Sequence, residues 1–192
     1  MRDKVRMISS ELLSDNWGEV KKSTFELQRR DGSWQRQVRE TYDCGHGAAV
    51  LLYNLEQRTV ILTRQFRFPA WFNGDENPWL VEVPAGKLDG DDPLTCARKE
   101  AEEEAGYRVH DLTQVAVIYA SPGSVTEKLW LFVGRYDRSS RVSPGGGLAH
   151  EGEDIETLEL PFAEALAMLD RGDITDAKTI LLLQHAALRG LL

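Results

Sequence analysis

The residues of this chain whose types and spacing suit chemistry are three glutamates near its middle. At about 100° per residue, Glu100, Glu103 and Glu104 fall in one arc of a predicted helix. Neighbouring carboxylates repel by about 0.2–0.5 kcal/mol per pair. A divalent cation would turn this repulsion into coordination, because hard cations such as Mg²⁺ prefer carboxylate oxygens. The pattern leaves two interpretations open, a solvated acidic face and a metal site.

The helix that must position these glutamates has recognisable ends. Asp92 is a good N-cap acceptor, Pro93 suits the first helical position, and Gly106 suits the residue just past the end. Gly86 and Gly90 are expected to bracket a short turn before the helix, and a loop that crowds one helix face favours the metal interpretation. An apolar stripe adjacent to the acidic arc would pack the helix on the fold: Leu94, Ala97, Ala101 and Ala105.

The stretch from Gly86 to Tyr107 resembles the box of the Nudix hydrolases, G-x5-E-x7-R-E-U-x-E-E-x-G-U. Three departures occur: Asp92 replaces Glu, Lys99 replaces Arg, and the spacer between them is one residue short. The helical end, KEAEEEAG, is intact, and in this family it carries the metal ligands. The short spacer also occurs in the branch of the family that cleaves GDP-mannose, which the chain resembles along nearly its whole length.

The resemblance implies an α/β (α+β) Nudix fold, a mixed β-sheet between helices, over residues 46–192. Residues 1–45 would form an N-terminal antiparallel β extension used for dimerisation. From the residues alone, two alternating runs joined at Asp31-Gly32 predict a hairpin there. Edge strands of small sheets need covering, which invites a second subunit. The resemblance implies a homodimer whose N-terminal strands reach the partner's site.

The remaining elements follow from alternation and turn residues. Residues Pro69–Pro78 are expected to be irregular, and residues 137–153 to form a flexible, glycine-rich loop. That loop is either a disordered surface segment or a moving part of an active site. Helices are expected over Phe162–Arg171 and about Asp176–Leu191. Strands are predicted over Gly47–Tyr53, Thr59–Phe66, Trp79–Val83, Arg108–Ala120, Glu127–Tyr136 and Ile155–Leu160.

The resemblance implies Mg²⁺-dependent hydrolysis, with Mn²⁺ as an alternative ion, of the pyrophosphate bond of a nucleoside diphosphate sugar. GDP-mannose would give GMP and mannose 1-phosphate. ADP-ribose, giving AMP and ribose 5-phosphate, is the alternative, because the segment around Glu151 and Glu153 is similar to that branch as well. From another class, the chain could be a nucleotide-sugar-binding regulator without catalysis. The intact KEAEEEAG argues against that role, since a site that has lost catalysis has no physical need for crowded carboxylates.

The same resemblance implies the roles of individual residues. The Ala85 carbonyl, Glu100, Glu104 and Glu153 would bind metal, with Glu103 as support or an additional ligand. Glu151 would be the general base. Arg39 and Glu40 would come from the partner subunit, and Trp17 would contact the base, although packing is the plainer role for such a tryptophan. The full set of expected substrate contacts is Trp17, Val38, Arg39, Glu40, Arg67, Gly86, Lys87, Glu127 and Lys178.

Composition agrees with a compact enzyme. The 192 residues, 42% of them hydrophobic, suffice for a full core, and the net charge of −8 argues against a nucleic-acid partner. A phosphate substrate would then need local Arg, Lys and metal. Cys44 and Cys96 are far apart in sequence, which predicts reduced thiols. No signal peptide is visible and no apolar run approaches the ~18 residues of a membrane span, so we expect a cytoplasmic protein without membrane contact.

Overall fold

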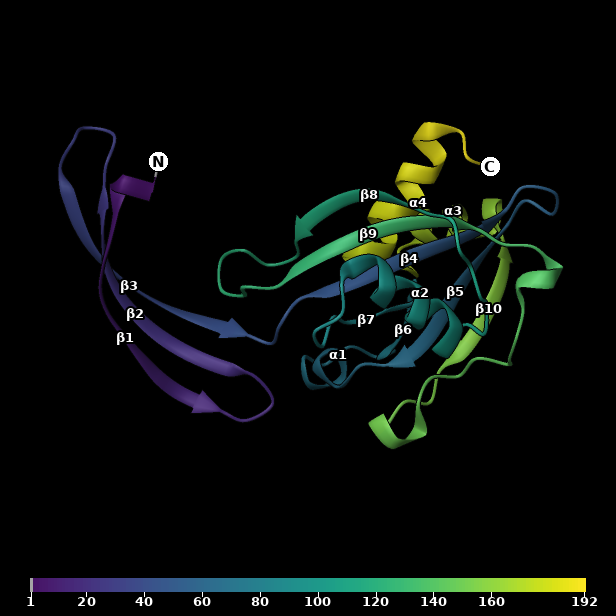
Figure 1. Cartoon of the computed structure of the whole chain (residues 1–192), viewed down its shortest axis with the longest axis horizontal. Coiled ribbons are helices and arrows are strands. Elements are labelled where there is room, and N and C mark those ends of the chain that lie inside the picture. Colours follow the sequence, from purple (N-terminus) through teal and green to yellow (C-terminus); the bar gives the residue numbers. More distant parts are fainter. Residues whose placement is uncertain (1) are drawn as a thin grey trace. The chain divides into compact units, whose positions relative to one another are not determined.

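The computed structural model describes residues 2–192, which fall into two compact units (Figure 1). The first unit consists of the chain up to His46 together with Tyr119–Lys128, and the second of Gly47–Ile118 together with Leu129–Leu192. No helix among the described residues is long and apolar enough to span a lipid bilayer. Cys44 and Cys96 are free thiols, as predicted.

The first unit is built on a three-stranded antiparallel sheet in the order β1–β2–β3. A 3₁₀ turn precedes the strands, and the bounds are η1 (Arg2–Lys4), β1 (Val5–Asp15), β2 (Glu19–Gln28) and β3 (Trp34–Asp43). The predicted hairpin at Asp31-Gly32 is confirmed, because Gln28 pairs with Trp34 across it. The segment Tyr119–Lys128 joins this unit at the end of β3, where the Tyr42 N–H donates to the Ser124 carbonyl at 2.8 Å.

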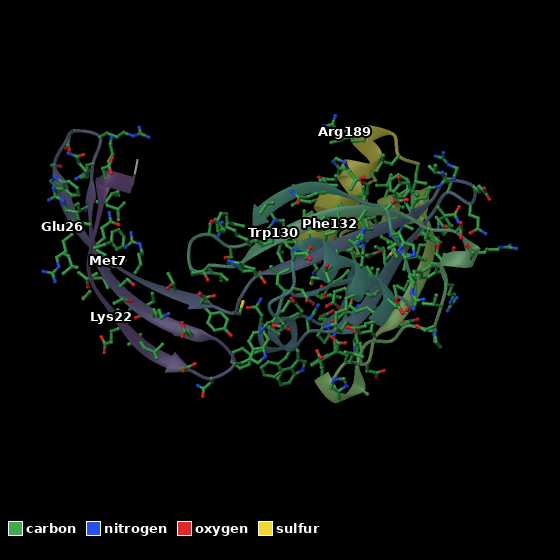
Figure 2. All side chains as sticks on the ribbon, in the orientation of Figure 1. Met7, Lys22, Glu26, Trp130, Phe132 and Arg189 are labelled. Atoms are coloured by element: carbon green, nitrogen blue, oxygen red, sulfur yellow. The ribbon has the colours of Figure 1, made fainter. Side chains whose placement is uncertain are left out.

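Strand β1 lies at the edge of this sheet and is exposed along nearly its whole length. Side chains such as Met7 on β1 and Lys22 on β2 project from the sheet (Figure 2). Five large apolar side chains of β1 are 45–64% exposed: Val5, Met7, Ile8, Leu12 and Leu13. An edge strand with this much apolar surface is suited to pairing with another chain.

The second unit contains a seven-stranded sheet in the order β10–β5–β4–β9–β8, with β6 paired to β5 and β7 paired to β4. Strands β4 and β9 are parallel, whereas β4 and β5 are antiparallel, so the predicted mixed sheet is confirmed. The bounds are β4 (Gly47–Asn54), β5 (Thr59–Phe66), β6 (Trp79–Glu82), β7 (Ala85–Lys87), β8 (Leu112–Tyr119), β9 (Lys128–Arg135) and β10 (Glu156–Pro161).

Helices cover both faces of this sheet, because alternate residues of the central strand point to opposite sides. Ala49 and Leu51 of β4 pack in one core with α3 (Phe162–Arg171) and α4 (Ala177–Arg189). On the other side, Val50 and Leu52 pack with α2 (Pro93–Glu103). The predicted sheet between helices is confirmed.

Two predicted segments are wrong in part. Residues Pro69–Pro78 are not wholly irregular, because they include most of the short helix α1 (Phe68–Phe72), whose first turn accommodates Pro69. Residues Arg108–Ala120 do not form one strand. The Arg108 N–H donates to the Ser140 carbonyl at 2.7 Å, so the start of this segment contacts a loop, and only Leu112–Tyr119 enters the sheet.

Two predicted loops are also more ordered than expected. Gly86 does not belong to a turn but to strand β7, where it pairs with Ala48. The stretch 137–153 contains two 3₁₀ turns, η2 (Arg138–Ser140) and η3 (Ala149–Glu151). It is also fixed to the rest of the unit, since the Val142 N–H donates to the Gly106 carbonyl at 2.8 Å.

Candidate active site

Helix α2 begins and packs as its sequence predicts. The Asp92 carboxylate accepts hydrogen bonds from the backbone N–H groups of Leu94 (3.0 Å) and Thr95 (3.1 Å), which satisfies two donors at the helix start. Ala97 and Ala101 are fully buried in the core. With its apolar stripe fixed against the sheet, the helix holds its adjacent acidic arc in a defined orientation.

Glu104 is the most deeply buried glutamate of this arc, with 3% of its surface exposed. One of its oxygens accepts the Ala85 N–H at 3.0 Å, so the end of α2 is tied to the start of β7. The backbone of Ala85, the expected source of a carbonyl ligand, therefore lies beside this carboxylate.

Glu100 lies against the backbone of Gly86 on β7. A Cβ atom at Gly86 would overlap the Glu100 carboxylate, so glycine here leaves room for that carboxylate in its present position. The Cys96 thiol, one turn earlier on α2, donates to the Lys87 carbonyl at 3.3 Å. Ala85, Gly86 and Lys87 thus form one wall of the site as strand β7, rather than a turn.

The glycine-rich loop brings a fourth carboxylate to the same place. Gly147 N–H donates to the Glu103 carbonyl at 3.0 Å, which anchors the loop on the last turn of α2. Glu153 then accepts the Leu148 N–H at 2.8 Å. Between the two loop acids, Gly152 adopts the left-handed conformation (φ 80°), so Glu151 and Glu153 diverge. Glu153 is partly buried, whereas the Glu151 side chain is 57% exposed.

We call Glu100, Glu104 and Glu153 the acidic cluster. Burial raises the pKa of Glu104 to about 8, and the negative charges of Glu100 and Glu153 add to this shift. Burial likewise raises the pKa of Glu100 to about 7, with further contributions from Glu103 and Glu153. These raised pKa values mean that the surrounding residues stabilise the ionised carboxylates poorly.

The acidic cluster suits a divalent cation by the chemistry of its donors. Carboxylate oxygens and the nearby Ala85 carbonyl are hard ligands of the kind that Mg²⁺ and Mn²⁺ prefer. Within residues 2–192, no three acidic, histidine or cysteine side chains are already gathered closely enough to hold an ion. The carboxylates instead stand within electrostatic reach of one another, and a cation would draw them together.

A second charged cluster, which we call the balanced cluster, consists of Arg67, Glu82, Asp176 and Lys178. Glu82 accepts from both Arg67 Nε (2.6 Å) and Arg67 Nη2 (2.9 Å), and it also accepts from the Lys178 ammonium. Lys178 donates in addition to Asp176 at 2.9 Å. The expected substrate contacts Arg67 and Lys178 are thus brought together by two acids that sequence analysis did not select.

A signal for Glu82 was present in the sequence. It stands alone in the apolar run Leu80-Val81-Glu82-Val83, and a charged residue in a buried strand requires a partner. Its partner Lys178 lies 96 residues further along the chain, however, so the pattern indicates a missing cation without identifying it.

Five expected substrate contacts belong to the first unit. Val38, Arg39 and Glu40 are consecutive exposed residues on β3, with Arg39 opposite Ser23 of β2. Trp17, in the turn between β1 and β2, is 72% exposed, and Glu127 lies in the segment that joins β3. The other expected site residues all belong to the second unit.

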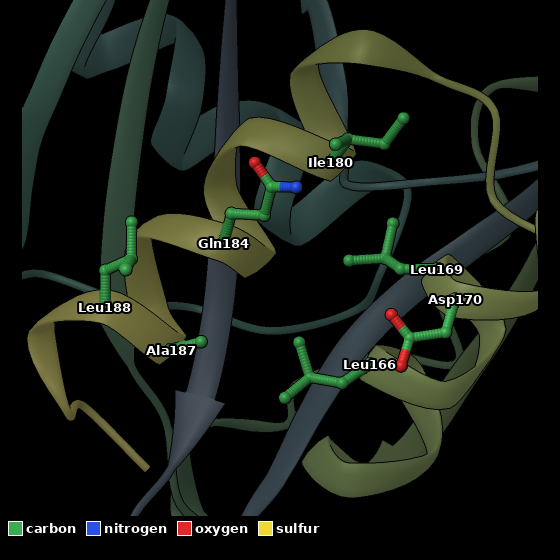
Figure 3. Close-up of a pocket in the computed structure, with 7 residues that line it drawn as sticks. All are labelled: Leu166, Leu169, Asp170, Ile180, Gln184, Ala187 and Leu188. Carbon is green, nitrogen blue, oxygen red and sulfur yellow. The ribbon is translucent and has the colours of Figure 1, made fainter.

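A pocket of about 470 Å³ lies between α3 and α4 (Figure 3). Its lining is aliphatic except for Asp170 and Gln184, and it contains none of the expected site residues. Its makeup offers neither the clustered charge nor the ligands that a phosphate substrate requires.

Comparison with known proteins agrees with the fold and the site. A sequence profile described as "GDP-mannose pyrophosphatase NudK N-terminal domain" matches residues 4–42, and the NUDIX domain profile matches residues 45–183. The chain is 50% identical to a GDP-mannose pyrophosphatase of Cronobacter sakazakii over 188 residues, covering 98% of this chain and 97% of that protein. A protein of the same name from Pectobacterium atrosepticum is 50% identical over 190 residues, covering 99% and 97%.

Among solved structures, one described as "Crystal structure of ADP compounds hydrolase" superimposes with a TM-score of 0.71 at 21% identity. It covers 98% of this chain and 96% of that one, which supports the fold. Since the NUDIX profile spans the whole region that carries the acidic cluster, the chain belongs to the Nudix hydrolase family.

Proposed function

We propose that this chain hydrolyses the pyrophosphate bond of GDP-mannose, giving GMP and mannose 1-phosphate, with Mg²⁺ as its metal ion. The observation that carries the proposal is the acidic cluster beside Ala85, in which burial and mutual repulsion of the carboxylates outweigh the nearby positive charges of Lys99 and Arg67. The two relatives described above, each half identical over nearly the whole chain, are named GDP-mannose pyrophosphatase. Nudix hydrolases generally use a divalent metal.

Negative charge opposes this reaction, because water must approach a phosphorus atom that is surrounded by negative oxygens. Glu100, Glu104, Glu153 and the Ala85 carbonyl would hold the cation, with Glu103 supporting them from the same helix. Bound there, a divalent ion would neutralise phosphate oxygens and acidify water. Arg67 and Lys178 would add positive charge from the neighbouring balanced cluster.

Glu151 would accept the proton from the attacking water. Its exposed carboxylate stands on a 3₁₀ turn, next to the anchored Glu153. As the water oxygen bonds to phosphorus, the bridging oxygen leaves with the other phosphate group. A base on a loop suits a step that is assembled only with substrate bound.

The first unit would complete the substrate site from a second copy of the chain. Arg39 and Glu40 of the partner would contact the substrate. Trp17 would contact the base, Glu127 the sugar or phosphate, and Val38 would add a further substrate contact. Strand β1 supports a homodimer, because it is an edge strand and its apolar side chains are exposed. We place this enzyme in the cytoplasm, where nucleotide sugars would be its substrates.

ADP-ribose is the second candidate substrate, and the fold neighbour described as an ADP compounds hydrolase favours testing it. The experiment is a Mg²⁺-dependent turnover screen of the purified chain with GDP-mannose, ADP-ribose, UDP-glucose and dinucleoside polyphosphates. We expect the highest kcat/KM for GDP-mannose, with GMP and mannose 1-phosphate as the products. A higher kcat/KM for ADP-ribose would identify ADP-ribose as the substrate instead. If none of these compounds is hydrolysed, the result would favour a nucleotide-sugar-binding regulator without catalysis.

A further inference from the structure

Within the balanced cluster, Glu82 holds Arg67 and Lys178, the two cations expected to contact the substrate. Glu82 stands at the end of β6, with 3% of its surface exposed. Its two oxygens accept side-on from Arg67 through Nε and Nη2, and the oxygen bonded to Nη2 also accepts from Lys178. One buried carboxylate therefore holds two cations, one that follows β5 and one from α4.

The far side of this cluster is fixed by further hydrogen bonds. Asp176, the N-cap of α4, accepts from Lys178 Nζ at 2.9 Å and from the Thr179 N–H at 2.9 Å. The Thr179 hydroxyl in turn accepts the Val83 N–H at 2.8 Å, next to Glu82 on the chain. Strand and helix are therefore held in register, and Glu82 has little freedom to move away from its two cations.

Among residues 2–192, Glu82 holds the Arg67 guanidinium by one edge. Because Nε and Nη2 face Glu82, the Nη1 group of the planar guanidinium points to the opposite side. The Arg67 side chain is 39% exposed, so it is not sealed inside the unit. Glu82 also stands three residues before Ala85, whose N–H donates to Glu104 at 3.0 Å, so the chain itself links this cluster to the acidic cluster.

We propose that Glu82 is a positioning residue for the diphosphate: it orients Arg67 so that the outer edge of the guanidinium meets phosphate oxygens, and it anchors Lys178 beside it. This inference rests on the proposed function. Without Glu82, the flexible arginine would have to be ordered at each binding event, which costs affinity. A purely structural ion pair is the competing explanation, since the cluster also links β6 to α4.

The test replaces Glu82 by glutamine, which keeps the shape but turns one acceptor into an amide donor that faces a cation. With GDP-mannose and saturating Mg²⁺, we expect KM to rise at least tenfold while kcat changes less than about threefold. Unchanged KM with a lower melting temperature would overturn the proposal in favour of the structural role.

A double-mutant cycle separates positioning from stability. In an Arg67→Ala background, Glu82→Gln should cost kcat/KM much less than it does in the wild type, because its main partner is gone. Additive losses would contradict the proposal. The matched control is Glu156→Gln, which breaks the exposed pair (2.9 Å) that Glu156 makes with Arg64 of β5 and should leave KM unchanged.

A binding measurement keeps this inference distinct from the choice of substrate. Inorganic pyrophosphate, which carries neither base nor sugar, should bind Glu82→Gln at least fivefold more weakly than wild type, as measured by calorimetry with Mg²⁺. If wild type fails to cleave GDP-mannose yet this difference persists, only the proposed function fails. Equal pyrophosphate affinity would overturn the role of Glu82. Should Glu82→Gln not fold, Glu82→Asp, which keeps the charge one methylene shorter, takes its place in the same assays.

Discussion

The two charged clusters of the second unit solve the problem of buried charge in opposite ways. In the balanced cluster, two acids and two bases neutralise one another, and Glu82 is fully ionised as a result: burial would raise its pKa, but Lys178 and Arg67 outweigh this effect and lower the pKa to about 2. In the acidic cluster, the pKa of Glu104 rises to about 8. The same type of side chain thus titrates far apart on the pH scale within one unit.

The difference shows what each cluster still lacks. Burying an ion without a partner is costly, so the balanced cluster carries its own counter-charges and requires nothing from outside the chain. The acidic cluster has too little counter-charge of its own, so its carboxyl groups keep their protons to higher pH. A divalent cation could replace those protons, and the contrast is testable by removing charge from either cluster.

The largest effect is expected from Glu104→Gln, which keeps the shape of the side chain and removes a charge from the acidic cluster. We expect kcat to fall by about 10²–10⁴, the scale of losing a main electrostatic stabiliser, with the fold retained. Steady-state kinetics at saturating Mg²⁺ measures this. The matched control is Glu102→Gln on the same helix, where Glu102 pairs with Arg108 at the surface, and it should keep kcat within about twofold. Near-normal turnover of Glu104→Gln would remove this residue from the set of metal ligands.

The next prediction separates the two acids of the glycine-rich loop. Glu151→Gln should lower kcat by about 10²-fold or more without changing the Mg²⁺ concentration needed for half-maximal rate, because an exposed base does not hold the ion. Glu153→Gln should raise that concentration, since Glu153 is anchored by its bond to Leu148. Rate against Mg²⁺ for both variants decides between the roles: rescue of Glu151→Gln but not of Glu153→Gln by excess Mg²⁺ would reverse the assignment.

The sequence predicted the acidic cluster better than the balanced cluster, for a physical reason. Glu100 and Glu104 are four residues apart on one helix, so helical geometry alone places them on one side. Arg67, Glu82 and Lys178 are distant in sequence and meet only because β5, β6 and α4 pack together. The local spacing of residues carries no information about contacts between side chains that are so far apart in the sequence.

The same distinction explains the fold. Strands β4 and β5 and helices α3 and α4 were predictable from alternation and periodicity. The pairing of Gly86 with Ala48, which makes β7 a strand, was not, because three residues are too few for a pattern. The assignment of Tyr119–Lys128 to the first unit likewise depends on long-range bonds such as that from Tyr42 to Ser124.

Acid should destabilise the protein through the balanced cluster. The pKa of Glu82 is about 2 in the folded chain and 4.5 without its partners, so the folded state holds fewer protons, and stability is lost as pH falls from about 4.5 towards 2. About 2.5 pH units at about 1.4 kcal/mol per unit give about 3.5 kcal/mol. Urea unfolding at pH 7, 5 and 3 measures this loss. Glu82→Gln should be less stable at pH 7 and lose less on acidification, whereas Glu156→Gln should follow the wild type. A Glu82→Gln variant as acid-sensitive as the wild type would show that other groups cause the loss.

The smallest effect, and the one that tests the contrast most directly, is the response of the metal-free protein to alkali and to cations. The pKa values of Glu100 and Glu104 are raised from 4.5 to about 7 and about 8, so the folded state holds more protons than the unfolded chain between pH 4.5 and 8. Stability of the metal-free protein should therefore fall as pH rises through this window, opposite in sign to the effect of Glu82. Mg²⁺ should restore this stability, because a cation supplies the positive charge that the protons supplied, and roughly 100-fold excess over its Kd stabilises by about 2.7 kcal/mol.

Thermal unfolding at pH 8 with EDTA or Mg²⁺ should show a clear rise in Tm with the ion, a smaller rise at pH 5.5, and little rise in Glu104→Gln. Since Glu104→Gln also loses a repulsive charge, its Tm in EDTA at pH 8 should equal or exceed that of the wild type. An equal Mg²⁺ response in both proteins would mean that the ion binds elsewhere, and the acidic cluster would then need another explanation for its uncompensated charge.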